Sequence, residues 1–156
     1  MRTSLKYYPR LKVWKNTTGS VTFDPETFEA HSYTWWKFVC KIGDYIVLNT
    51  YSYSVSTSAH QAEVFSLLEN KYNINCYYYC EDEPKNPNVI QIEAPDGLGK
   101  LHAAIRHYTG MIKELLKAIN TPRSHKKKNE ERRALIEEYK KKISIIECLI
   151  ELQKTN

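Results

Sequence analysis

Apolar side chains in the last third of the chain recur at alternating spacings of three and four residues. The first run consists of Leu98, Leu101, Ile105, Tyr108, Ile112, Leu115 and Ile119. The second consists of Ile136, Tyr139, Ile143, Ile146 and Ile150, with Gln153 continuing the spacing. This heptad spacing keeps an apolar stripe facing a partner helix along its whole length. The two runs therefore predict a pair of helices that pack against each other.

The segment between the two runs contains residues that end one helix and begin the next. Pro122 cannot continue a helix, because it has no amide hydrogen, and Asn129 is a suitable N-cap for the second helix. Matching the two stripes places Tyr108 opposite Ile143 and puts the turn in the lysine-rich segment. We therefore predict an antiparallel coiled-coil hairpin over residues 97–156.

The earlier part of the chain carries short runs of β-branched and aromatic residues separated by turn residues. The strongest signal joins residues 33–42 to residues 45–55 through Gly43-Asp44, and two β-rich runs around such a turn are typical of a β-hairpin. The other expected strands are residues 10–16, 20–24, 74–80 and 89–93.

A single helix is expected within this part of the chain. Ser58 and Gln61 have the spacing of a capping box, which satisfies free backbone amides at a helix start. We predict that the helix runs from there to about residue 70. The fold class is therefore α+β: a small, mostly antiparallel β-sheet with one packed helix over residues 1–96, followed by the hairpin.

The positive charge of the chain is concentrated in its last third. Residues 1–100 carry 10 Lys and Arg against 11 Asp and Glu, whereas residues 101–156 carry 13 against 7. Six cations near the expected turn form the main candidate site: Arg123, Lys126, Lys127, Lys128, Arg132 and Arg133. Such a cluster can neutralise phosphates of nucleic acid or meet an acidic protein surface. The alternative is a solvated loop that keeps the protein soluble.

A second candidate site follows from the alternation of side chains along the expected β-hairpin. One face is predicted to belong to the core, and it carries Trp36, Phe38, Cys40 and Ile42. The other face carries Tyr33, Trp35, Lys37, Lys41, Tyr51 and Tyr53. Aromatic rings beside lysines can stack the bases of single-stranded nucleic acid. Alternatively, a helix covers this face.

The segment 94–101 reads Ala-Pro-Asp-Gly-Leu-Gly-Lys-Leu and lies between an expected strand and an expected helix. It resembles the phosphate-binding loop of thymidylate-kinase-like P-loop enzymes, which implies nucleotide binding. That family has glycine at the first position and a magnesium-binding Ser or Thr at the last, where this chain has Ala94 and Leu101. Only 55 residues follow, too few for a parallel nucleotide-binding sheet. We therefore interpret the segment as a tight turn with Asp96 as a helix N-cap.

The remaining chemistry-bearing residues show no diagnostic spacing. The cysteines, at positions 40, 76, 80 and 148, suit neither a disulfide framework nor a zinc site, and they indicate free thiols in a reducing cytoplasm. The five histidines have no catalytic or metal-binding spacing. No stretch approaches the ~20 apolar residues that span a bilayer. We expect no catalytic residue, no metal, no cofactor and no membrane partner.

These observations predict a small, non-enzymatic, cytoplasmic binding protein. We expect it to engage nucleic acid, or a nucleic-acid-handling complex, through the basic tip of the hairpin. Its size and its lack of enzyme motifs would suit a phage or mobile-element protein that inhibits a host system. One alternative is a protein–protein adaptor or a homodimer assembled through the hairpin. Another is an enzyme of unrecognised type.

Overall fold

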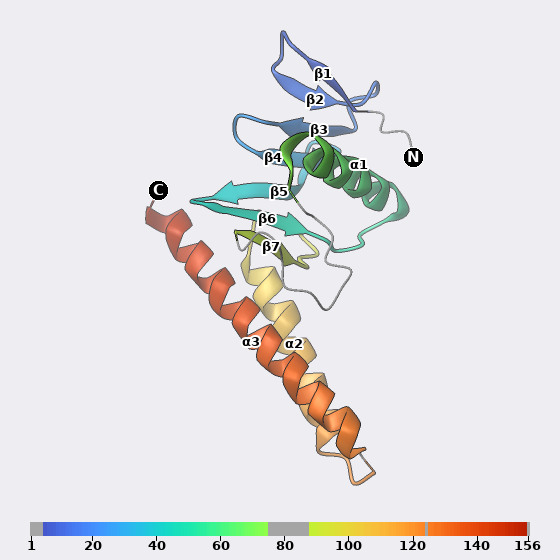
Figure 1. The fold of residues 1–156 in the computed structure, drawn as a ribbon, viewed down its shortest axis with the longest axis vertical. Coiled ribbons are helices and arrows are strands. Elements are labelled where there is room, and N and C mark those ends of the chain that lie inside the picture. The colour runs from blue at the N-terminus through green and yellow to red at the C-terminus, as the bar shows by residue number, and fades with distance from the viewer. Residues whose placement is uncertain (1–4, 75–87, 124, 156) are drawn as a thin grey trace. The chain divides into compact units, whose positions relative to one another are not determined.

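Figure 1 shows the computed structural model, which describes residues 5–74, 88–123 and 125–155. The chain separates into two compact units, Met1–Gly99 and Lys100–Asn156, which we call the sheet unit and the hairpin unit. The fold is α+β as predicted.

The sheet unit contains an open sheet whose strands follow one another in chain order. Neighbouring strands are antiparallel except for the last pair, β6 and β7, which is parallel. The described strands are β1 (Lys6–Tyr8), β2 (Val13–Lys15), β3 (Val21–Asp24), β4 (Glu29–Ser32), β5 (Trp36–Ile42), β6 (Tyr45–Asn49) and β7 (Val89–Ile92). The strand expected over residues 74–80 falls almost wholly outside the described residues.

One helix, α1 (Val55–Tyr72), packs on a face of this sheet. Its capping box is formed by Ser54 and Thr57: the Thr57 amide donates to Ser54 Oγ at 3.1 Å, and the Ser54 amide donates to Thr57 Oγ1 at 2.9 Å. The expected pair, Ser58 and Gln61, is therefore wrong by about one helical turn. The Gln61 side chain instead donates to the Asn49 carbonyl at 2.6 Å.

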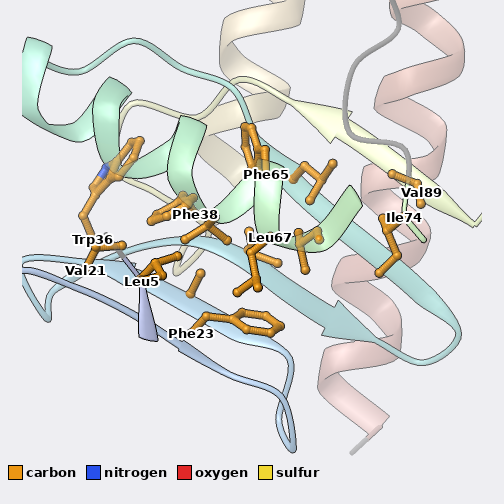
Figure 2. Packing of buried hydrophobic residues seen from close by; sticks show 14 residues of the cluster. Leu5, Val21, Phe23, Trp36, Phe38, Phe65, Leu67, Ile74 and Val89 are labelled. Carbon is orange, nitrogen blue, oxygen red and sulfur yellow. The ribbon is translucent and has the colours of Figure 1, made fainter. Parts of the chain in front are cut away.

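The core of the sheet unit lies between α1 and the sheet, as Figure 2 shows. Phe38 of β5 meets Phe65 of α1 with ring centroids 6.0 Å apart, and Phe23 of β3 meets Tyr72 at the end of α1 at 5.6 Å. Edge-on aromatic contacts of this kind add to the burial of apolar area. Leu48 and Leu68 are fully buried in the same cluster.

A β-bulge in β5 changes which side chains share a face. Ala30 pairs with Val39 while His31 pairs with Lys37, so Phe38 is an extra residue, and both Phe38 and Val39 join the α1-side cluster. Alternation is inverted beyond that point. The prediction that Cys40 and Ile42 share the face of Trp36 is therefore wrong, although both are buried.

The segment 94–98 is tied to the sheet by backbone bonds. The Leu98 amide donates to the Lys37 carbonyl at 2.9 Å, and the Gly97 amide donates to the Ala94 carbonyl at 3.0 Å. A phosphate-binding loop needs such amides free to face the ligand, so this geometry contradicts the P-loop resemblance. Asp96 is not the N-cap either, because the residue before α2 (His102–Ile119) is Leu101, which makes no side-chain cap bond.

The hairpin unit consists of α2 and α3 (Lys126–Thr155), which run antiparallel as predicted. The ring of Tyr108 stacks on that of Tyr139 with centroids 5.3 Å apart, whereas the predicted register placed Tyr108 opposite Ile143. Tyr108 therefore meets a residue of α3 that lies one helical turn nearer the connection than the predicted partner. α3 begins at Lys126, earlier than predicted, which puts Asn129 inside the helix and not at its N-cap.

Among the helices that the structure describes, none combines the length and the apolar character needed to cross a membrane.

Candidate nucleic-acid interface

The six predicted cations come together at the end of the hairpin unit where α2 connects to α3. Arg123 lies in the connection between the helices, and the others occupy the beginning of α3. All are exposed except Arg132, which is half-buried. We call this set the basic tip: Arg123, Lys126, Lys127, Lys128, Arg132 and Arg133.

The half-buried position of Arg132 has a structural cause. Its Nη1 donates to Asn129 Oδ1 at 2.9 Å, and Asn129 is itself only 8% exposed. The Asn129 amide also donates to the His125 carbonyl at 2.9 Å, which continues the helix toward the connection. Arg132 is therefore the oriented member of the basic tip, while its lysines extend into solvent.

The position of the lysines at the start of α3 makes the tip more positive than their number alone implies. A helix N-terminus carries a partial positive charge and unpaired backbone amides, so cations there are unfavourable by ~0.3–1 kcal/mol each. No acidic residue occupies the first turn of α3. Glu130 and Glu131 follow immediately and offset part of this charge. An anionic ligand would relieve the repulsion that remains.

An aromatic clamp holds the two helices together along the stem of the hairpin. The stacked rings of Tyr108 and Tyr139 are accompanied by the Lys142 ammonium, which lies 5.4 Å and 5.8 Å from their centroids. Cation–π contacts of this kind contribute ~0.5–1 kcal/mol at exposed sites. The clamp fixes the register of the helices that carry the basic tip.

The six residues of the second candidate site do not form one continuous face, because Tyr51 is partly buried and the bulge separates the two lysines. Trp35 and Tyr53 lie together, with ring centroids 5.9 Å apart, and Tyr33 packs on His60 of α1 at 5.0 Å. Tyr51 is partly buried against the α1-side core.

The two lysines of this site are separated by the bulge. Lys37 lies opposite His31 and pairs with Glu29 at 2.9 Å. Lys41 lies opposite Ile46, whose side chain packs against the α1-side core. The bulge therefore places Lys37 and Lys41 on opposite faces of the sheet, although alternation predicted that they share one face.

A buried serine–histidine network in the sheet unit was not anticipated from the sequence. His60 Nδ1 lies 2.7 Å from Ser32 Oγ, and its Nε2 lies 3.3 Å from Ser20 Oγ. Burial lowers the pKa of His60, with an opposing contribution from Glu63. Ser32 is fully buried, so its hydroxyl is closed to a substrate. This network joins α1 to β4 and serves the fold.

Cys40 offers a test of the buried face of β5. Burial raises the pKa of the Cys40 thiol to about 11, whereas Cys148 is exposed on α3. Because the thiolate is the reactive species, iodoacetamide at pH ~8 should label Cys148 and leave Cys40 unmodified in the native protein. Peptide mass spectrometry distinguishes the two sites. Equal native labelling of both thiols would contradict the assigned burial.

Within residues 5–74, 88–123 and 125–155, no group of three His, Cys, Asp or Glu side chains is placed to hold a metal ion. The chain matches no protein-family model, and no curated protein or solved structure matches it either.

Proposed function

We propose that this protein binds nucleic acid through the basic tip and acts as a non-enzymatic binding protein in the cytoplasm. The observation that carries the proposal is the exposure of Lys126, Lys127 and Lys128 at the N-terminal end of α3. Three cations at the positive end of a helix dipole oppose the stability of that helix. A polyanion would convert this repulsion into attraction, through both the ammonium groups and the helix terminus.

The distribution of charge supports a polyanion over a neutral ligand. The hairpin residues 101–156 carry a net charge of +6, while residues 1–100 carry −1. Phosphates spaced regularly along a strand can contact several cations of the tip at once, and each contact releases a bound counterion. The half-buried guanidinium of Arg132 adds a donor of fixed direction, which suits phosphate oxygens.

The test is a charge reversal with a matched control. The triple variant Lys126→Glu, Lys127→Glu, Lys128→Glu should weaken binding of labelled DNA and RNA by about 100-fold or more. The control is Lys6→Glu, Arg10→Glu, Lys12→Glu, which changes the same number of exposed, clustered cations in the sheet unit.

Fluorescence anisotropy at one fixed salt concentration measures both variants. The proposal predicts that only the tip variant loses binding. Three outcomes would contradict it: no binding by the wild type, an equal loss in both variants, or equally tight binding of polyglutamate.

The alternative function of the hairpin unit is assembly, either as an adaptor or as a homodimer. A shallow groove of about 500 Å³ along the helices favours it, lined by His107, Gly110, Met111, Glu114, Leu115 and Leu135. The net charge of +6 on residues 101–156 opposes self-association there, since like charges repel across a symmetric interface. We therefore place nucleic-acid binding first.

A further inference from the structure

The sheet unit exposes an aromatic patch that neither its core nor the basic tip explains. Trp35 is 61% exposed, Tyr53 is 52% exposed, and Val55 at the start of α1 is 89% exposed. Tyr33 lies in the same turn as Trp35 and is 44% exposed. We call these four residues the aromatic patch.

The rings of the patch are held in place by contacts with a buried tryptophan. Tyr53 contacts Trp35 at 5.9 Å between ring centroids, and it contacts the fully buried Trp36 at the same distance. Trp36 is anchored in turn, because its Nε1 donates to the Pro95 carbonyl at 3.3 Å. Exposed rings that are already fixed lose little conformational freedom on binding, which is typical of recognition surfaces.

The turn that presents Trp35 is strained. Tyr33 has a φ of +54° and Thr34 has a φ of +67°, in the left-handed region that favours glycine. For a β-branched residue such as threonine this conformation is an outlier. It is held by the bond from the Tyr33 amide to the Ser20 carbonyl at 2.6 Å and by the packing of Tyr33 on His60. Strain maintained in this way is concentrated at binding sites.

The composition of the patch suits burial against an uncharged surface. The segments that form it, residues 32–36 and 49–59, contain no charged residue and are rich in Tyr, Trp, Ser and Thr. Interface centres are depleted of charge and enriched in Tyr and Trp, which are the commonest binding hot spots with Arg. Burying this patch would desolvate no ion.

We propose that the aromatic patch is a homodimer interface, in which two sheet units meet across a two-fold axis. An interface on such an axis sets a surface against itself, so the surface must tolerate its own charge. Residues 1–100 carry a net charge of only −1, and the segments of the patch carry none. The hairpin, with +6, does not satisfy this condition. The dimer is independent of nucleic-acid binding at the basic tip.

Sedimentation velocity of the full chain tests the dimer, from low micromolar to several hundred micromolar protein, at high salt and after nuclease treatment. The wild type should sediment as a dimer at the upper end of this range. The variant Trp35→Ala should weaken dimerisation by roughly 30-fold or more, as for a hot-spot residue. Leu11→Ser removes another exposed apolar side chain, 58% exposed in the connection between β1 and β2, and should leave dimerisation unchanged.

A second variant guards against loss of folding in Trp35→Ala. Val55→Arg changes an 89% exposed residue at the start of α1 and places like charges against each other across the proposed axis, so it should also give a monomer. Leu116→Ser, on the exposed surface of α2, tests assembly through the hairpin instead. A monomeric wild type would overturn the proposal. So would a dimer that survives Val55→Arg, or one that is lost only in Leu116→Ser.

Discussion

Replacing Asn49 with alanine is expected to lower the free energy of unfolding of the sheet unit by about 3–5 kcal/mol. Asn49 is fully buried at the end of β6. Its side-chain amide donates to the Ala94 carbonyl at 2.9 Å, and its Oδ1 accepts from the amides of Ala94 at 3.0 Å and Tyr51 at 3.1 Å. Alanine would remove the side-chain acceptor of the Ala94 and Tyr51 amides, at a cost of ~1–3 kcal/mol for each amide that is left buried and unpaired, while the Ala94 carbonyl would keep its bond from the Gly97 amide.

Urea denaturation followed by tryptophan fluorescence measures this loss, because all three tryptophans lie in the sheet unit. Asn70→Ala is the matched control: its side chain is exposed, and among the described residues it bonds Ser66 Oγ in the same helix, at 3.2 Å. We expect the control to change stability by less than about 0.5 kcal/mol. A similar, small effect of both substitutions would show that Asn49 does not carry the connection between β6 and the segment after β7.

Replacing Gly97 with alanine is expected to destabilise the same unit by about 2–4 kcal/mol. A Cβ at this position would lie 2.8 Å from the Lys37 carbonyl oxygen and 3.4 Å from Trp36 Cδ1. The residue also has a φ of +78°, which alanine adopts only with strain. The bond from the Leu98 amide to Lys37 would therefore have to lengthen.

Two other glycines separate the contributions of strain and of steric overlap. Gly19 has a φ of +74° but open space at its Cβ position, so Gly19→Ala should cost only the strain of ~1 kcal/mol. Gly99 has neither a positive φ nor a close neighbour, and its substitution should be neutral or slightly stabilising. Urea denaturation of the three variants should give the order Gly97, Gly19, Gly99 from largest to smallest loss. Any other order would contradict the close approach of the 94–98 segment to β5.

The parts of the fold that follow from periodicity were predictable. The heptad spacing located both helices of the hairpin, but their connection precedes the lysine run in which it was predicted, because α2 ends at Ile119 and α3 begins at Lys126. Alternation also identified Trp36 and Phe38 as core residues. These patterns depend on side chains repeated over many residues, so a single irregular position does not remove them.

Elements that depend on neighbouring strands were not predictable. The sequence of β4, Glu-Ala-His-Ser, contains one apolar residue, and it forms a strand because β3 and β5 supply hydrogen-bonding partners on both sides. β1, with three residues, is similarly short. The bulge at Phe38 leaves no mark in the sequence, and it accounts for the separation of Lys37 from Lys41.

The two candidate surfaces also differ in how far the sequence predicts them. The exposure of the basic tip follows from sequence, because a lysine run at the end of a helical hairpin has no core to enter, although the lysines begin α3 and do not lie in the connection. The aromatic patch does not, because β6 ends at Asn49 and α1 begins at Val55, where a continuous strand was expected. Alternation grouped Trp35 with Tyr53 on one face, but the chain between β6 and α1, and not a continuous strand, brings the two rings together.

The most direct test of nucleic-acid binding at the basic tip is the salt dependence of the observed association constant. For duplex DNA, the slope of its logarithm against the logarithm of salt concentration should reach about −5 if all six cations contact phosphates. The neutral variant Lys126→Gln, Lys127→Gln, Lys128→Gln should make this slope shallower by about 2 to 3. A wild-type slope near zero, or the same slope in both proteins, would contradict the assignment of the basic tip as the nucleic-acid site.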